Sequence, residues 1–238
     1  MTLPESARPN CLFSAPFHFI EENALDDFRS VMPTTFREIW RASELEPSAP
    51  YTAWIVNPGQ DFTVDPEILD RMPRLEVLVT PSTGRNHIQV EACRSRGVTV
   101  LSLLDDRPTL DTISASAEFT FLLLLNALRR LDFAVSEVRE GRWREREDDR
   151  RGVELQGKRV GIVGFGRIGQ RIARYCTAFD ARVSYHDPHV TELHVDGKNL
   201  ERIFSDSDVV CVCCALTVET TGMVGYELLR RLRPGAVL

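Results

Sequence analysis

The chain has 238 residues, of which 43% are hydrophobic and 27% are charged, and its formal net charge is −6 at pH 7. These values are typical of a soluble globular protein with one large or two modest domains. A net negative charge argues against nucleic acid as a partner, because phosphate binding requires a clustered basic surface. The arginine-rich stretch 139–151 is interleaved with acidic residues, so we interpret it as a solvated loop or helix end.

The N-terminus has no basic segment that leads into an apolar one, so it gives no sign of secretion. The apolar stretch 119–128 is interrupted by Asn126 and is far shorter than the roughly 20 apolar residues that cross a membrane. The six cysteines lack metal-ligand spacing, so we interpret them as reduced, mostly buried side chains with no metal bound. In a strand, Cys211 and Cys213 would face one side and Cys214 the other. We therefore expect a cytoplasmic protein with no membrane partner.

Residues 1–106 alternate β-type and helical runs, which is the pattern of an α/β domain with parallel strands. The predicted strands are 11–13, 53–56, 75–79 and 98–101, and the predicted helices are 66–71 and 88–96. Residues 105–108 break this pattern, and Asp111 or Thr112 can cap a long helix that runs to about Arg130. That helix would be roughly 27 Å long, and its apolar content nearly all round predicts burial. We expect it to join the first domain to a second, residues 107–238.

A glycine motif, Gly164-Phe165-Gly166-Arg167-Ile168-Gly169, lies between a β-type run, 158–163, and a predicted helix, 167–179. Asp187 closes the next β-type run, 181–186. A Gly-x-Gly-x-x-Gly motif in this context, with an acid about 20 residues downstream, predicts a dinucleotide-binding site. The first glycine permits a tight turn, the second lets the backbone approach the pyrophosphate, and the third lets the helix pack on the strand. The helix N-terminus then faces the phosphates.

Asp187 also indicates which dinucleotide is bound. A carboxylate that accepts a hydrogen bond from a ribose hydroxyl gains about 1.5–3 kcal/mol, whereas a 2′-phosphate in the same place meets like charge at a cost of about 1–4 kcal/mol. The following residues, Pro188 and His189, supply no arginine to reverse this preference. We therefore predict NAD rather than NADP.

After the motif, the sequence predicts a helix near 200–204, a third strand at 208–214, a helix at 226–232 and a fourth apolar strand at 236–238. A six-stranded dinucleotide fold has two halves. We expect the chain to hold only the first half, which leaves the NAD-binding domain incomplete at its C-terminus.

Four stretches, 81–88, 116–120, 155–169 and 208–222, resemble the D-isomer-specific 2-hydroxyacid dehydrogenases, a family that includes D-3-phosphoglycerate, formate and D-lactate dehydrogenases. The resemblance implies two Rossmann-like or flavodoxin-like parallel-sheet domains, with the substrate domain first and the NAD-binding domain second. It also implies NAD as cofactor, a small 2-hydroxy or 2-oxo acid as substrate, and a homodimer formed through the cofactor domain and the long helix near 113–130.

The resemblance further implies that backbone N–H groups of a small-residue loop, here Ser82, Thr83 and Gly84, hold the substrate carboxylate. Thr83 also matches a position that approaches the nicotinamide end. Arg85 stands where the family often has an apolar residue, so it could reach an anionic end of the substrate, or it could be a surface arginine without that role.

On the cofactor side, Arg167 and Ile168 match the pair whose backbone lies against the pyrophosphate, and Asp187 matches the acid that binds ribose. The predicted cofactor contacts are Thr83, Gly164, Gly166, Arg167, Ile168, Gly169, Asp187, Cys214, Ala215 and Thr220. The last three lie in a stretch that departs from the family, because Cys-Cys-Ala-Leu at 213–216 replaces the usual His-x-Pro-Leu.

The implied reaction is reversible hydride transfer between nicotinamide C4 and C2 of a 2-oxo acid. It needs an acid–base group and a cation to polarise the carbonyl. The family supplies a histidine, an assisting carboxylate and an arginine, and none of these has a counterpart up to Leu238. His87 lies nearest the substrate loop, but a histidine there also occurs in the family without a catalytic role. We therefore predict no catalytic residue, and we expect weak or absent NAD binding and no turnover from this polypeptide.

Two alternatives remain open at this point. The chain could be a catalytically inactive NAD-binding or partner-binding module of the same fold, as in the C-terminal-binding corepressors that resemble this family. It could also fold poorly and bind nothing, because an unfinished parallel sheet exposes unpaired backbone groups.

Overall fold

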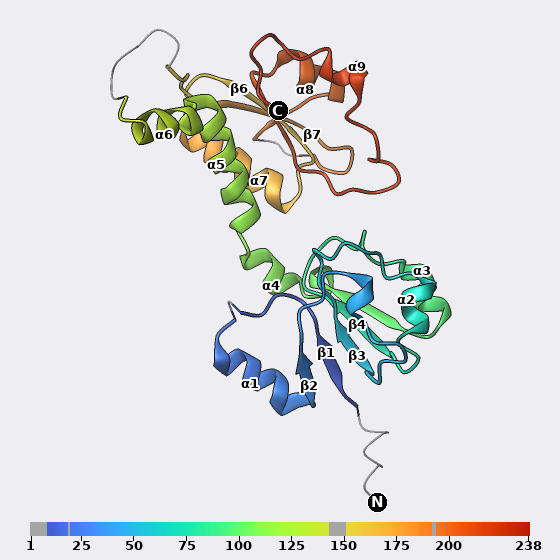
Figure 1. The fold of residues 1–238 in the computed structure, drawn as a ribbon. Helices are drawn as coiled ribbons and strands as arrows, with labels where there is room; N and C mark the ends of the chain where they lie inside the picture. Colours follow the sequence, from blue (N-terminus) through green and yellow to red (C-terminus); the bar gives the residue numbers. More distant parts are fainter. Residues whose placement is uncertain (1–8, 19, 143–150, 192–193) are drawn as a thin grey trace, which may run out of the picture. The chain divides into compact units, whose positions relative to one another are not determined.

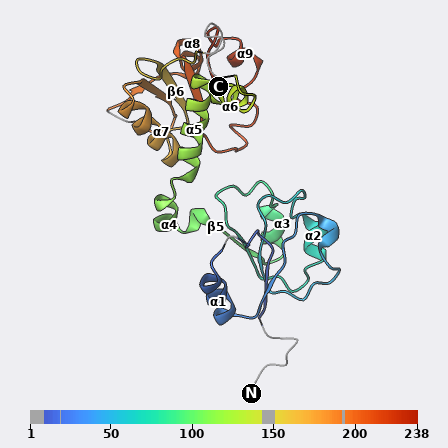
Figure 2. The same cartoon turned by 60° about the vertical axis from the view of Figure 1, so that its left-hand side comes forward.

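A computed structural model describes residues 9–18, 20–142, 151–191 and 194–238. The chain divides between Leu110 and Asp111 into two compact units, which we call the N-terminal and the C-terminal unit. Each unit is built on its own parallel sheet (Figures 1 and 2). The predicted α/β fold with two parallel-sheet domains is confirmed.

The N-terminal unit has a five-stranded parallel sheet in the order β2-β1-β3-β4-β5. Its strands are β1 (Cys11–Phe13), β2 (Thr34–Phe36), β3 (Ala53–Ile55), β4 (Val77–Thr80) and β5 (Thr99–Ser102). This is the flavodoxin-like order, in which ligands bind at the carboxyl ends of the strands. Leu12, Trp54 and Leu78, from the three central strands, are fully buried in the core of the unit.

The helices of this unit are α1 (Glu22–Val31), α2 (Pro66–Asp70) and α3 (Val90–Ser95), with short 3-10 turns at Ala42–Glu44 and Leu103–Asp105. The start of α2 is well specified, because Asp65 accepts a hydrogen bond from the Ile68 N–H at 3.0 Å and Pro66 occupies the first turn. The sequence did not predict α1 or β2. Only Leu25 of α1 is buried, and β2 is a three-residue edge strand, so neither carries a clear apolar pattern.

The C-terminal unit has a parallel sheet in the order β8-β7-β6-β9. Its elements are β6 (Arg159–Val163), α7 (Arg167–Ala178), β7 (Arg182–His186), β8 (Asp196–Gly197), α8 (Leu200–Asp206), β9 (Val209–Val212) and α9 (Tyr226–Leu229). Beyond β9, Val237 forms a parallel bridge to Val209. These segments match strands 3-2-1-4-5 of a dinucleotide fold. Because the sequence did not predict β8, residues 236–238 are the fifth segment of this sheet and not the expected fourth.

Helices cover both faces of this sheet. Along β9, Val209 and Cys211 pack in the cluster formed with α5 (Ala115–Arg129) and α7, whereas Val210 packs in the cluster formed with α8 and α9. The alternation extends past the strand, because Cys213 joins the first cluster and Cys214 the second. The predicted division of these three cysteines between the two faces is thus confirmed.

The predicted helix that ends near Arg130 is confirmed as α5, but its predicted start at Asp111 or Thr112 was wrong. A separate helix, α4 (Arg107–Thr112), precedes it, and a further helix that the sequence did not predict, α6 (Leu131–Arg139), follows it. The break between α4 and α5 lies where the Ile113 carbonyl accepts a hydrogen bond from the Arg167 guanidinium. Arg130 adopts a left-handed conformation, with φ of 52°, between α5 and α6.

The predicted burial of this helix was also wrong on one side. Ala117, Leu124 and Leu128 are buried, but Phe119, Leu122 and Leu123 are 61%, 52% and 49% exposed. The described part of the chain contains no helix long and apolar enough to cross a membrane. Of the arginine-rich stretch 139–151, residues 143–150 lie outside the described residues, and Arg142 forms ion pairs with Glu137 and Glu140.

Candidate functional site

The turn between β6 and α7 requires glycine at two positions. Gly164 has φ of +88°, and a Cβ on it would lie 2.5 Å from the backbone nitrogen of Cys214. A Cβ on Gly169 would lie 2.2 Å from the Gly164 carbonyl oxygen. The turn, the first part of α7 and the chain after β9 are therefore packed backbone against backbone, as the glycine spacing predicts.

The N-terminus of α7 presents unused donors. Within the described part of the chain, the N–H groups of Gly166, Arg167, Ile168 and Gly169 donate no hydrogen bond, and the first helical bond is Gln170 N–H to the Gly166 oxygen at 2.9 Å. A Cβ on Gly166 would meet no heavy atom within 4 Å. An anion can therefore approach these N–H groups at the positive end of a 12-residue helix.

Asp187 lies beside this turn in a fixed orientation. Its Oδ2 accepts a hydrogen bond from the Phe165 N–H at 2.8 Å, and its Oδ1 accepts one from the His189 N–H at 2.9 Å. A carboxylate has about four acceptor sites, so two remain for hydroxyl donors. The structure thus brings the glycine turn and the acid together, as a dinucleotide site requires.

Two buried aromatic rings support the turn, and sequence reasoning missed them. Phe165 stacks on Tyr185 with ring centroids 4.2 Å apart, and the Tyr185 hydroxyl donates to the Val190 carbonyl at 3.2 Å. Phe165 occupies a variable position of the motif and Tyr185 lies on the next strand. The sequence shows only that an aromatic residue lies in the motif and another on the following strand. It does not show that the two rings stack.

The small-residue loop of the N-terminal unit follows β4 at the carboxyl end of the sheet. The Ser82 hydroxyl donates to the Gly84 carbonyl at 2.7 Å, and the Ser82 carbonyl accepts from the Leu103 N–H at 3.1 Å. The N–H groups of Ser82, Thr83 and Gly84 donate no hydrogen bond to any described residue, and the space next to Gly84 is open to 4 Å. This backbone can hold an anion such as a carboxylate.

Comparison with known proteins decides the family. The family description "D-isomer specific 2-hydroxyacid dehydrogenase, catalytic domain" matches residues 37–137, and "D-isomer specific 2-hydroxyacid dehydrogenase, NAD binding domain" matches residues 121–238. A glyoxylate reductase of Thermococcus gammatolerans is 33% identical over 92% of this chain and 68% of its own length. The chain belongs to the D-isomer-specific 2-hydroxyacid dehydrogenase family.

A second curated relative and a solved structure are also similar to this chain. A D-3-phosphoglycerate dehydrogenase of Mycobacterium tuberculosis is 34% identical over 74% of the chain, which spans only 33% of that relative's length. The crystal structure of the TT0316 protein from Thermus thermophilus superposes with a TM-score of 0.79 and 28% identity, covering 96% of this chain and 72% of that one. NAD is the cofactor of the domain that matches the C-terminal unit.

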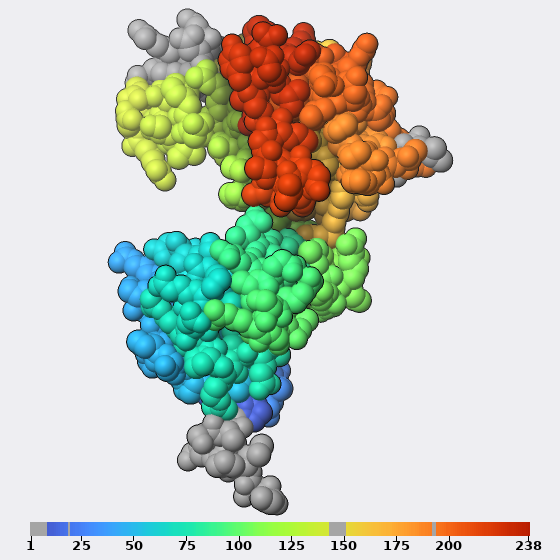
Figure 3. Space-filling view, turned by 90° about the vertical axis from the view of Figure 1, so that its right-hand side faces the viewer, coloured from blue at the N-terminus to red at the C-terminus, as the bar shows by residue number. Residues whose placement is uncertain are grey.

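The loop after β9 holds the predicted cofactor contacts Cys214, Ala215 and Thr220. The close approach to Gly164 places the Cys214 backbone beside the turn. The Thr220 hydroxyl donates to the Ala215 carbonyl at 2.6 Å and accepts from the Thr217 N–H at 2.8 Å, so it closes the loop on itself. Leu216 and Val218 are exposed, and the last residues of the chain, red in Figure 3, form part of the surface of the C-terminal unit.

Arg85 and His87, which flank the small-residue loop, both have partners within the N-terminal unit. The Arg85 guanidinium donates to Asp105 at 2.8 Å and to Ser102 at 2.7 Å. His87 Nε2 lies 3.0 Å from the Thr80 hydroxyl, and burial lowers the pKa of the imidazole, which keeps it neutral at pH 7.

The three cysteines on the α7 side of the sheet, Cys176, Cys211 and Cys213, are unreactive in this fold. Burial, followed by the effect of neighbouring thiols, raises the pKa of each to about 12. All six cysteines of the chain are free thiols. The described residues contain no group of three or more histidine, cysteine or acidic side chains arranged to hold a metal ion.

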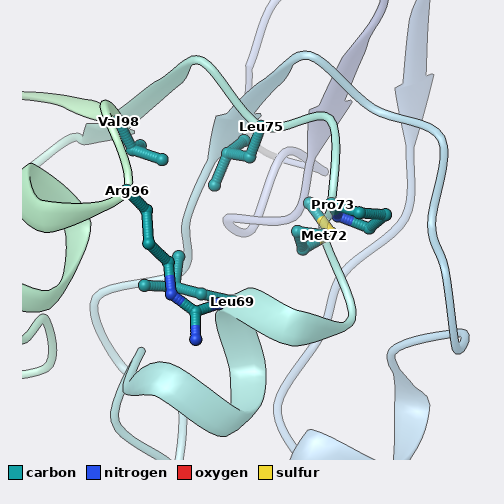
Figure 4. A pocket seen from close by; sticks show the side chains of 6 residues that line it. All are labelled: Leu69, Met72, Pro73, Leu75, Arg96 and Val98. Carbon is teal, nitrogen blue, oxygen red and sulfur yellow. The ribbon is translucent and has the colours of Figure 1, made fainter.

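A surface hollow of about 350 Å³ lies elsewhere in the N-terminal unit (Figure 4). It is lined by Leu69, Met72, Pro73, Leu75, Arg96 and Val98. Leu75 lies two residues before β4 and Val98 directly precedes β5, so the hollow lies at the amino ends of these parallel strands. The small-residue loop lies at their carboxyl ends, and the hollow is therefore a separate feature.

Proposed function

We propose that this protein serves in NAD-dependent hydride transfer between a D-2-hydroxy acid and the corresponding 2-oxo acid. The observation that carries the proposal is the open N-terminus of α7 beside Asp187. The loop at Ser82, Thr83 and Gly84 also supports it, because its unused N–H groups can bind an anion. This loop lies within residues 37–137, which match the catalytic domain of the family. Bound NAD supplies or accepts the hydride at C4 of its nicotinamide.

In this proposal the residues of the chain bind and orient. The N–H groups of Gly166, Arg167 and Ile168 donate to the pyrophosphate, and the Asp187 carboxylate accepts from the ribose hydroxyls. Cys214, Ala215 and Thr220 contribute the wall of the cofactor site after β9. The N–H groups of Ser82, Thr83 and Gly84 hold the substrate carboxylate, and Thr83 also approaches the nicotinamide.

A second candidate is an inactive NAD-binding or partner-binding module of the same fold. It is favoured because no described residue is assigned to proton transfer in the reaction. The sequence resemblance assigns none of these residues to the family's histidine, assisting carboxylate or arginine. His87, the nearest histidine to the substrate loop in sequence, is neutral and bonded to Thr80. We therefore propose that the 238-residue polypeptide alone binds NAD weakly and does not catalyse hydride transfer between NAD and a 2-hydroxy or 2-oxo acid.

The two candidates are separated by measuring NADH binding and NADH oxidation on the same preparation. Enhanced NADH fluorescence without consumption of NADH in the presence of glyoxylate or hydroxypyruvate supports binding without turnover. Measurable oxidation contradicts the proposal that this polypeptide lacks a proton-transfer group. Absence of any NADH signal contradicts the cofactor-site proposal itself.

We also propose that the protein forms a homodimer in the cytoplasm. The exposed apolar face of α5, formed by Phe119, Leu122 and Leu123, supports the dimer, because such a patch favours burial against another surface. The free thiols support the compartment. Leu122→Glu should convert a dimer to a monomer in sedimentation, whereas Leu229→Glu, an exposed leucine on α9, should not. A monomeric wild-type protein contradicts the dimer.

A further inference from the structure

A group of polar side chains joins the small-residue loop to the turn after β5. Arg85, the residue after Gly84, donates from Nε and Nη2 to the Ser102 hydroxyl at 3.1 and 2.7 Å. Its Nη2 also donates to Asp105 Oδ2 at 2.8 Å. We call these three residues, Arg85, Ser102 and Asp105, the Arg85 network. It links two loops that are 20 residues apart in the sequence.

Asp105 is the acceptor on which the Arg85 network converges. Its Oδ2 also accepts from the Ser102 N–H at 2.8 Å and from the Ser102 hydroxyl at 3.1 Å. The Ser102 N–H and hydroxyl and the Arg85 guanidinium together lower the pKa of Asp105, so it is ionised at neutral pH. Ser102 itself is buried. The ion pair is thus anchored to the buried end of β5, an edge strand of the sheet.

The small-residue loop is held from two further directions. The Leu103 N–H donates to the Ser82 carbonyl at 3.1 Å, on the side of the Arg85 network. The buried Thr80 hydroxyl lies 3.3 Å from the Ser82 hydroxyl. Gly84 nevertheless faces open space. The loop therefore has a fixed backbone on the protein side and unused N–H donors on the other.

The charge balance of the Arg85 network decides between two roles for Arg85. A guanidinium paired with a carboxylate at 2.8 Å presents little net charge to a second anion nearby. A distant anionic group of a substrate would have to compete with Asp105. The unused N–H groups of Thr83 and Gly84 meet no such competition, because they have no described partner.

We propose that Arg85 is a positioning residue of the substrate site. Through Ser102 and Asp105, it fixes the N–H groups of Ser82, Thr83 and Gly84 in the geometry that receives a carboxylate, and it does not bind a second anionic group of the substrate. This inference rests on the proposed function of the small-residue loop.

The test compares two probes, glyoxylate with one carboxylate and 2-oxoglutarate with two, by amide chemical-shift titration of the NAD-supplemented protein. Arg85→Ala and Asp105→Asn should weaken both probes by the same factor, about tenfold. The double variant should be no weaker than either single one, because both act through one network. Arg85→Lys, which keeps the charge but not the paired donors, should fall between wild type and Arg85→Ala.

Two controls exclude the loss of an unrelated ion pair and misfolding as causes of weaker binding. Arg94→Ala removes an exposed ion pair with Glu91 on α3 and should leave probe binding unchanged. Thermal unfolding checks that every variant folds. Without any probe, amide hydrogen exchange at Leu103, whose N–H donates to the Ser82 carbonyl, should accelerate in Arg85→Ala and remain unchanged in Arg94→Ala.

Each contrary result has a distinct meaning. If Arg85→Ala weakens only 2-oxoglutarate, Arg85 contacts a second anion and the positioning role is wrong. If neither exchange nor binding changes, the Arg85 network has no role in the loop. If exchange accelerates but the wild type binds neither probe, the positioning of the loop stands and its proposed function as a carboxylate site fails.

Discussion

The turn after β6 and the loop after β4 both present backbone N–H groups to an anion, but different interactions hold the two backbones in place. Each follows a parallel strand at its carboxyl end and presents backbone N–H groups that have no described partner. The turn after β6 is held by backbone contacts at Gly164 and Gly169 and by the Phe165–Tyr185 stack. The loop after β4 is held by polar side chains, above all the Arg85 network. Steric fixation should tolerate changes of pH, whereas polar fixation should not.

The largest effect should come from the backbone contact at Gly169. Gly169→Ala places a methyl group 2.2 Å from the Gly164 oxygen, so we expect the C-terminal unit to lose about 1–3 kcal/mol of stability and all measurable NADH binding. Gly166→Ala is the matched control, since it meets open space and should reduce NADH binding at unchanged stability. Urea unfolding measures the stability of each variant, and NADH fluorescence measures its affinity for NADH. Equal stability of the two variants would show that steric contact does not fix this turn.

A smaller effect should follow removal of the acid. Asp187→Ala should weaken NAD binding about tenfold or more, the value of a charge-assisted hydrogen bond, and leave NADP binding unchanged or stronger. Asp196→Ala removes an exposed carboxylate of β8 that pairs with Lys198 at 3.7 Å, and it should change neither affinity. Titration with both dinucleotides measures the ratio. A parallel loss of NAD and NADP would argue against a ribose contact.

The smallest effect should be the pH response of the loop after β4. The pKa of Asp105 is below its ordinary value because of the Ser102 N–H and hydroxyl and the Arg85 guanidinium. A lowered pKa means that the stabilisation is complete above the ordinary value of about 3.9 and is lost as pH falls through the folded-state pKa. Amide signals of Gly84 should therefore shift on acidification below about pH 4, and this shift should be absent in Asp105→Asn. A shift that persists in Asp105→Asn would contradict the polar fixation of this loop.

Local sequence patterns predicted much of the fold and the cofactor turn. Helix α2 has a capping aspartate and a proline, and in the β6–α7 turn Gly169 packs against Gly164, five residues before it. Such requirements are visible in sequence because they constrain residues close together in the chain. Apart from the edge strands β2 and β8, the strands of both sheets carry apolar runs.

The missed features depend on contacts between distant residues. The break before α5 involves Arg167, which lies 54 residues from Ile113. The partner of Arg85 lies 20 residues away, and a single arginine among many gives no sign of it. The exposed face of α5 was assigned to the core because apolar content alone does not say what covers it.

The buried thiols of Cys176 and Cys211 make the C-terminal unit a reporter of its own opening. Because burial raises the pKa of each of these two thiols to about 12, alkylating reagents should reach them chiefly in unfolded chains. The rate of maleimide labelling then measures how often this sheet comes apart. A dinucleotide that binds the folded C-terminal unit more tightly than the unfolded one should lower the rate of maleimide labelling, even where its binding is too weak to detect by fluorescence.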